Sequence, residues 1–113
     1  MGAPALRWLV FEASEGDDGI ETFDAEAAGR TPAQQHEIEA EIAAVLAWAQ
    51  AVFPGGPGAL DAGAPWDEAR QQTPGTDGWT TLALTLCGGP AFAEAFSAVF
   101  AAALANADED NAN

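Results

Sequence analysis

Acidic side chains cluster in one short stretch of the sequence, between residues 12 and 26. Several oxygen ligands beside a tight turn could bind a hard cation such as Ca²⁺. A calcium-binding EF-hand loop with Gly19 at its sixth position would, however, need acids where the chain has Ser14, Gly16 and Ala25. We therefore interpret the stretch as a solvated acidic hairpin and expect no bound metal or cofactor. Its carboxylates are Glu12, Glu15, Asp17, Asp18, Glu21, Asp24 and Glu26.

The only histidine and the only cysteine lack the companions that catalysis requires. A helical zinc-protease motif would place a second histidine four residues after His36, where the chain has Ala40. Cys87 precedes a predicted helix start, where a thiolate can be stabilised, but no second cysteine and no adjacent base accompany it. The sequence predicts no catalytic residues, and we expect a protein that is not an enzyme.

Tryptophan and threonine side chains on one sheet face are the remaining candidates. If the alternate leucines of the last predicted strand face the core, Trp79 and Thr81 point to the other face. Similar alternation allows Trp8 or Trp66 to lie on that same outer face. Some RNA-binding proteins stack bases on such a face, but the charge of this chain argues against that use. We predict that these four residues bind a protein partner; alternatively, the rings cover the core edge or pack beneath a long loop.

The net charge restricts the classes of partner. Three arginines, no lysine and 18 acids give a formal charge of −15, while 49% of the residues are hydrophobic. The chain is therefore apolar enough to fold. Its charge makes direct binding to nucleic acid or to anionic membranes unfavourable and favours a basic protein or a cation. Lysine-free composition is typical of GC-rich coding sequences, and it would also suit a high-salt cytoplasm.

The chain length of 113 residues predicts one domain. We expect this domain at residues 1–105, followed by a flexible acidic tail at residues 106–113. A single cysteine excludes an internal disulfide. No apolar run is long enough for a membrane span or a secretion signal. We expect a cytoplasmic protein without a membrane anchor.

Period-two alternation predicts four strands, and helical periodicity predicts two helices. Thr31, Pro32 and Gln34 form a capping-box sequence before the first helix, whose apolar stripe runs to Pro54. The second helix starts at Gly88-Gly89-Pro90. The strands are predicted at residues 6–13, 20–27, 66–72 and 77–87. The predicted fold is α+β, a two-layer sandwich in ββαββα order, with a four-stranded, mainly antiparallel sheet and both helices on one face.

Two further features concern the organisation of the chain. Asp18-Gly19 and Asp77-Gly78 align at an offset of 59, and Pro32 aligns with Pro90 at an offset of 58. These matches are compatible with two copies of one ββα unit, although matches at turns also arise by chance. Residues 54–65 are rich in glycine and proline and predict a loop without regular structure, of a length that is often functional or mobile.

The leading hypothesis is a small non-enzymatic protein that binds another protein, or a second copy of itself, through the outer sheet face or the acidic hairpin. One alternative is an acidic inhibitor that mimics nucleic acid on the surface of a basic protein. The other is a small-molecule-binding protein or enzyme with a pocket under the 54–65 loop.

Overall fold

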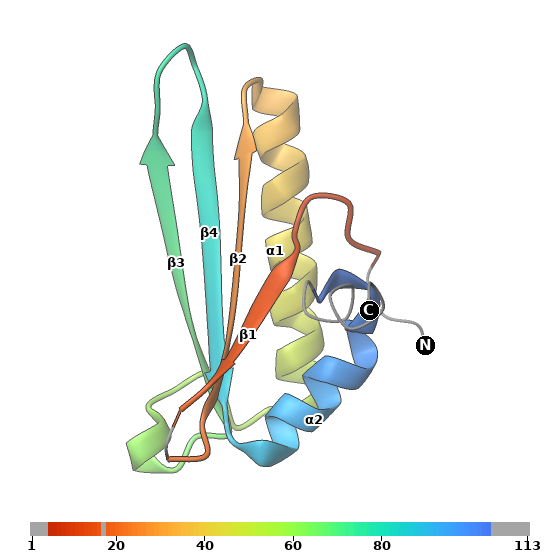
Figure 1. Cartoon of the computed structure of the whole chain (residues 1–113), viewed down its shortest axis with the longest axis vertical. Helices are drawn as coiled ribbons and strands as arrows, with labels where there is room; N and C mark the ends of the chain where they lie inside the picture. Colours follow the sequence, from red (N-terminus) through yellow and green to blue (C-terminus); the bar gives the residue numbers. More distant parts are fainter. Residues whose placement is uncertain (1–4, 17, 105–113) are drawn as a thin grey trace, which may run out of the picture.

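The fold is a four-stranded sheet with two helices on one side (Figure 1). The computed structural model describes residues 5–16 and 18–104. Neighbouring strands are antiparallel, in the order β1-β2-β4-β3. The predicted α+β fold with ββαββα order is confirmed. The elements are β1 (Phe11–Glu15), β2 (Glu21–Gly29), α1 (Pro32–Val52), η1 (Leu60–Ala62), β3 (Trp66–Pro74), β4 (Thr80–Gly88), α2 (Pro90–Val99) and η2 (Ala101–Ala103).

The start of α1 is as the sequence predicts. The Thr31 hydroxyl accepts a hydrogen bond from the Gln34 backbone N–H at 3.1 Å, and the Gln34 side chain accepts one from the Thr31 N–H at 3.3 Å. Pro32 occupies the first helical position, where a missing N–H costs nothing. No helix in the described part of the chain is long and apolar enough to cross a membrane. The predicted tail at residues 106–113 lies outside the described residues.

An aromatic core fills the space between the sheet and the helices. The rings of Phe11 and Phe23 lie 5.1 and 4.3 Å from the ring of Phe96 on α2, measured between centroids. Trp48, on the flank of α1, packs edge-on against Phe100 at 5.1 Å between ring centroids and belongs to this core. The inward side of β4 is also as predicted: its buried leucines are Leu82, Leu84 and Leu86.

The first predicted strand is wrong at its N-terminal end, because β1 begins only at Phe11. A carboxylate of α1 holds the preceding residues instead. Glu41 accepts hydrogen bonds from the backbone N–H groups of Arg7, Trp8 and Leu9, at 2.7, 3.0 and 3.1 Å. Those donors are therefore satisfied by the helix and not by the sheet. The 54–65 loop also differs from its prediction, since it contains one short 3₁₀ turn, η1.

The β1–β2 and β3–β4 hairpins have the same pairing register: adding 59 to the residue numbers of a pair in the first gives a pair in the second. Phe11 pairs with Ala25 in the first hairpin, and the residues 59 positions later, Arg70 and Leu84, pair in the second. The bounds of β2, 21–29, become those of β4, 80–88, by the same offset. The β1–β2 and β3–β4 hairpins are thus the same structural unit, in agreement with the turn matches in the sequence.

Candidate functional site: the open face of the sheet

The side of the sheet that faces away from the helices carries small and polar side chains. Figure 1 shows that neither helix covers it. Alternation along each strand assigns its residues, because the buried side chains define the opposite face. They are Glu12 and Ser14 on β1; Thr22, Asp24, Glu26 and Ala28 on β2; Thr81, Ala83, Thr85 and Cys87 on β4; and Asp67, Ala69, Gln71 and Thr73 on β3.

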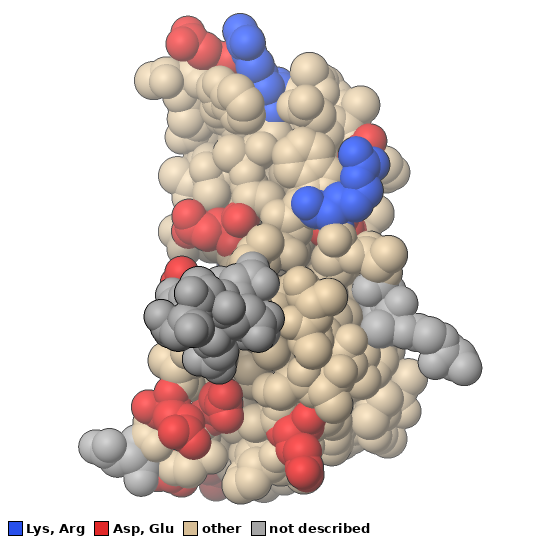
Figure 2. Space-filling model, turned by 45° about the vertical axis from the view of Figure 1, so that its right-hand side comes forward, with Lys and Arg blue, Asp and Glu red and all other residues tan. Residues whose placement is uncertain are grey.

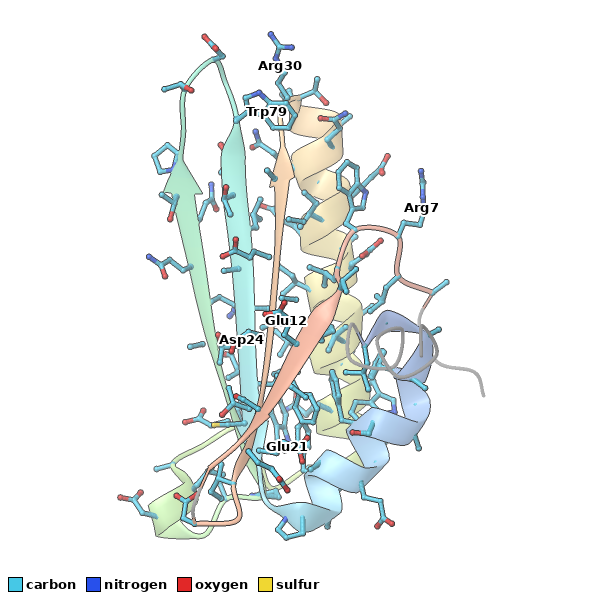
Figure 3. All side chains as sticks on the ribbon, viewed as in Figure 1. Arg7, Glu12, Glu21, Asp24, Arg30 and Trp79 are labelled. Carbon is cyan, nitrogen blue, oxygen red and sulfur yellow. The ribbon has the colours of Figure 1, made fainter. Side chains whose placement is uncertain are left out.

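An acidic pair occupies the β1–β2 side of this open face. Glu12 lies directly opposite Asp24 in the ladder (Figure 3), and Glu26 is the next residue on the same face of β2. The Thr85 hydroxyl donates a hydrogen bond to Asp24 Oδ1 at 2.6 Å. Together with Val10, which is 53% exposed, the three carboxylates line a hollow of about 360 Å³. Like charges placed directly opposite each other destabilise a sheet.

No described arginine lies close enough to neutralise this pair. Arg7 contacts Glu37 of α1 at 3.9 Å, and Arg70 contacts Glu68 at 3.3 Å on the helix side of β3. Arg30 follows the far end of β2. The basic side chains visible in Figure 2 lie in the upper half of the view, and the charged side chains visible at its lower end are acidic. The carboxylates of the open face are therefore uncompensated within the described chain.

A second like-charge pair lies on the helix side of the same hairpin. Glu15 is directly opposite Glu21, and both line a hollow of about 490 Å³ together with Glu94 of α2. Glu21 lies on the inner side of β2, at the end of the strand. In the part of the chain that the structure describes, no group of three or more histidine, cysteine or carboxylate side chains is arranged to hold a metal ion.

A third hollow lies beside the thiol of Cys87, at the β3 side of the open face. It measures about 590 Å³. Partial burial, and then the negative charge of Asp67 opposite it in the ladder, raise the pKa of the Cys87 thiol. The fraction of Cys87 present as thiolate at neutral pH is therefore smaller than for an ordinary cysteine, which argues against an activated nucleophile. The other walls of the hollow are formed by Asp18, Ile20, Ala59, Leu60, Asp61 and Asp67.

The prediction that Trp66 lies on the outer face is wrong. The residue is 1% exposed, stacks on Phe92 at 5.8 Å between ring centroids, and donates its indole N–H to the Phe53 carbonyl at 2.9 Å. The register explains this position, because Trp66 shares the inward side of β3 with Glu68, the partner of Leu86. The alternative interpretation, packing beneath the long loop, holds for this ring: a Cβ on Gly56 would lie 2.6 Å from its Nε1.

Trp8 is also away from the outer face. It precedes β1, is half-buried, and donates its indole N–H to Glu37 Oε1 of α1 at 3.0 Å. Alternation cannot place this residue, because the segment from Arg7 to Leu9 is bonded to α1 and lies outside the sheet.

Trp79 and Thr81 remain available at the surface. Trp79 lies in the turn before β4, is 43% exposed, and sits at the same end of the molecule as Arg30 (Figure 3). Thr81 lies on the open face between Ala28 and Thr73. The structure therefore brings Thr81 to the predicted face, with Trp79 beyond its end and the other two tryptophans elsewhere.

Sequence reasoning missed Val10 and the pairing of the acids. The acidic hairpin itself was evident, but the opposition of Glu12 and Asp24 depends on the register. The Gly16 N–H donates to the Ile20 carbonyl at 2.8 Å, and this closure places Glu15 opposite Glu21 and fixes every pair after them. A tight turn over residues 16–19, which the Gly-Asp-Asp-Gly sequence suggests, would instead place Glu15 opposite Ile20. In comparisons with known proteins, no family model, no curated protein and no solved structure matches this chain.

Proposed function

We propose that this protein is a non-enzymatic interaction module that binds a basic protein partner through the open face of its sheet. The observation that carries the proposal is the uncompensated pair of Glu12 and Asp24, directly opposite each other beside Glu26. Cationic side chains of a partner would relieve the repulsion within this group. Exposed Val10 lines the same hollow and supplies an apolar contact beside the carboxylates.

The rest of the open face supports a broad contact. Its middle carries Ala69, Ala83 and Thr85, whose short side chains leave the surface flat enough for another protein to approach. Trp79 and Thr81 extend the same surface toward the end of β4. Electrostatic attraction would mainly accelerate association and select basic partners, while the small residues would provide close contact.

An acidic inhibitor that mimics nucleic acid is the narrower form of this proposal. It adds that the partner surface normally binds phosphates, so that the protein and a nucleic acid compete for it. Competition between this protein and a DNA duplex for the captured partner tests that addition. We propose no small-molecule site at the 54–65 loop. The Trp66 ring fills the space at Gly56, and among the described residues the polar side chains of the open hollow beside Ala59 and Leu60 are only the Cys87 thiol and three carboxylates, those of Asp18, Asp61 and Asp67.

The experiment is capture of partners from an extract of the source cells on immobilised protein, followed by elution with increasing salt. The test variant is Glu12→Gln with Asp24→Asn, in which both charges are lost and the amide introduced at position 24 keeps an oxygen for the Thr85 hydroxyl. The control is Glu15→Gln with Glu94→Gln, which changes the net charge equally on the helix side of the sheet.

We expect the unmodified protein and the control to retain the same basic protein. The test variant should bind that protein with about tenfold weaker affinity and release it at lower salt. Equal retention by the test variant and the control would refute the proposed site. Thermal unfolding of all three proteins establishes that they are equally folded.

A further inference from the structure

The outer edge of β3 has unpaired backbone groups at two residues. Gly75 donates its N–H to the Trp79 carbonyl at 2.7 Å, so the odd-numbered residues of β3 bond to β4 and the even-numbered ones point away. Trp66 agrees with this assignment, because its carbonyl accepts a hydrogen bond from Gly58 in the loop. Within residues 5–16 and 18–104, no segment pairs with the outward groups of Arg70 and Gln72.

The same two residues line a cleft between β3 and α1. The cleft measures about 410 Å³. Its apolar side chains come from Ile42, Leu82 and two alanines, and its polar ones from Glu39, Gln71 and the two edge residues. Ala43, an exposed residue of α1, forms part of the opposite wall. An open strand edge beside a groove with apolar residues at its base is the arrangement in which extended peptides add to a sheet and place alternate side chains in the groove.

The other edge of the sheet indicates what fits at such a position. Arg70 corresponds to Phe11 at the offset of 59, and Phe11 on β1 forms a parallel bridge with Leu104. Leu104 follows η2 and packs against the core. At the β1 edge the described chain therefore places an apolar residue of its own, Leu104, in extended conformation, and it leaves the equivalent place beside β3 open.

We propose that the β3 edge and its cleft form a second docking site, for an extended segment of a partner protein. The segment adds as a strand beside β3, pairs with the backbone of Arg70, and covers Ile42 and Leu82 with an apolar side chain, as Leu104 does at Phe11. This site is separate from the acidic pair of the open face. A second copy of the chain is a poor occupant, because each copy carries a charge of −15.

The test uses the peptide acetyl-Lys-Thr-Leu-Thr-Leu-Thr-Lys-amide, titrated into isotopically labelled protein and followed by amide NMR spectra and hydrogen exchange. We expect the resonances of Ala43 and Leu82 to shift and the amides of Arg70 and Gln72 to exchange more slowly when the peptide is bound. Gln72→Pro removes an outward N–H without removing a bond to β4, and it should weaken binding at least about tenfold. Gln72→Thr retains that N–H and should bind like the unmodified protein.

A second pair of variants tests the cleft. Ala43→Phe fills it from an exposed helical position and should weaken binding to a similar extent, whereas Ala40→Phe places the same ring on another exposed part of α1. Three results would each overturn the proposal: equal binding by Gln72→Pro and Gln72→Thr, peptide shifts confined to the residues around Glu12 and Asp24, and no saturable binding up to about millimolar peptide. Dimerisation of the free protein through β3, seen by sedimentation, would overturn the choice of a partner segment as occupant.

Discussion

The two hairpins of this protein have one backbone register and two different surfaces. In the first hairpin, five acids occupy both faces and the free edge is covered by Leu104. In the second, the corresponding residues are neutral, and the edge is open at Arg70 and Gln72. The shared register therefore determines which positions lie opposite each other. The side chains at those positions determine the charge of each surface. The acids Glu12, Glu15, Glu21, Asp24 and Glu26 correspond to Gln71, Pro74, Thr80, Ala83 and Thr85.

The clearest contrast lies at one equivalent pair of positions. Phe11 is fully buried against Phe96, whereas Arg70 extends along the surface of the cleft. The difference follows from what covers each edge. An apolar ring is stable at β1 because α2 and Leu104 close over it, and a charged side chain is tolerated at β3 because nothing in the described chain covers it.

Alanine substitutions at these two positions should differ most in their effect on the free energy of unfolding. Phe11→Ala should destabilise the protein by about 3–5 kcal/mol, because it leaves a cavity in the aromatic core. Arg70→Ala should cost less, about 1 kcal/mol, because it leaves the partly buried Glu68 carboxylate without the cation that lies 3.3 Å from its Oε1. Denaturant unfolding of the two variants measures both values. Similar losses would mean that the two edges are equally important to the fold.

The second largest effect concerns the residues just before β1. Glu41→Ala should cost about 1–3 kcal/mol, because it removes the acceptor of the Arg7, Trp8 and Leu9 N–H groups. Hydrogen exchange at those three amides should accelerate together. The second hairpin has no counterpart, since the corresponding residues of β3 lie in the sheet. Glu39→Ala, two residues earlier on α1, is the control; an equal loss there would show that helix charge and not the hydrogen bonds is responsible.

The parts that could be predicted from sequence are those determined by local chemistry. Capping by Thr31 and Gln34, the alternating leucines of β4 and the helical apolar stripes are each encoded within a few residues. These local signals were sufficient to predict the order of strands and helices and the two-layer fold. The offset of 59 was also visible, because turns require particular residues such as Asp-Gly.

The candidate site depended on contacts between distant segments. Whether Trp8 lies in the sheet depends on Glu41, which is 33 residues away in the chain. Trp66 could be placed only by knowing that its strand pairs with β4 and that Gly56 of the loop folds over it. Alternation divides the side chains of a strand between two faces, but in an edge strand it does not show which face is buried. For this reason Trp8 and Trp66 were wrongly placed on the outer face.

A smaller effect concerns charge repulsion in the first hairpin. Glu12→Gln should stabilise the protein by about 0.5 kcal/mol, because it leaves Asp24 without a like charge directly opposite. The gain should shrink as salt screens the repulsion. Gln71→Glu, at the equivalent position, should have almost no effect, since it faces Ala83. Denaturant unfolding at low and high salt tests both variants, and a gain from Glu12→Gln that is independent of salt would contradict the electrostatic explanation.

The smallest effect belongs to the second hairpin, which alone carries a thiol. Burial and the charge of Asp67 raise the pKa of Cys87, so the folded protein favours the neutral thiol and the unfolded chain releases the proton more easily. The associated stability is fully present below the ordinary thiol pKa of about 8.5 and is lost as pH rises through the folded-state value. Asp67→Asn should therefore lower the thiol pKa, accelerate alkylation of Cys87 at about pH 8.5, and flatten the loss of stability above that pH. Unchanged alkylation rates in Asp67→Asn would mean that burial alone raises the pKa of Cys87. Asp67 would then exert no electrostatic effect on its cross-strand partner, in contrast to Glu12 and Asp24 in the first hairpin.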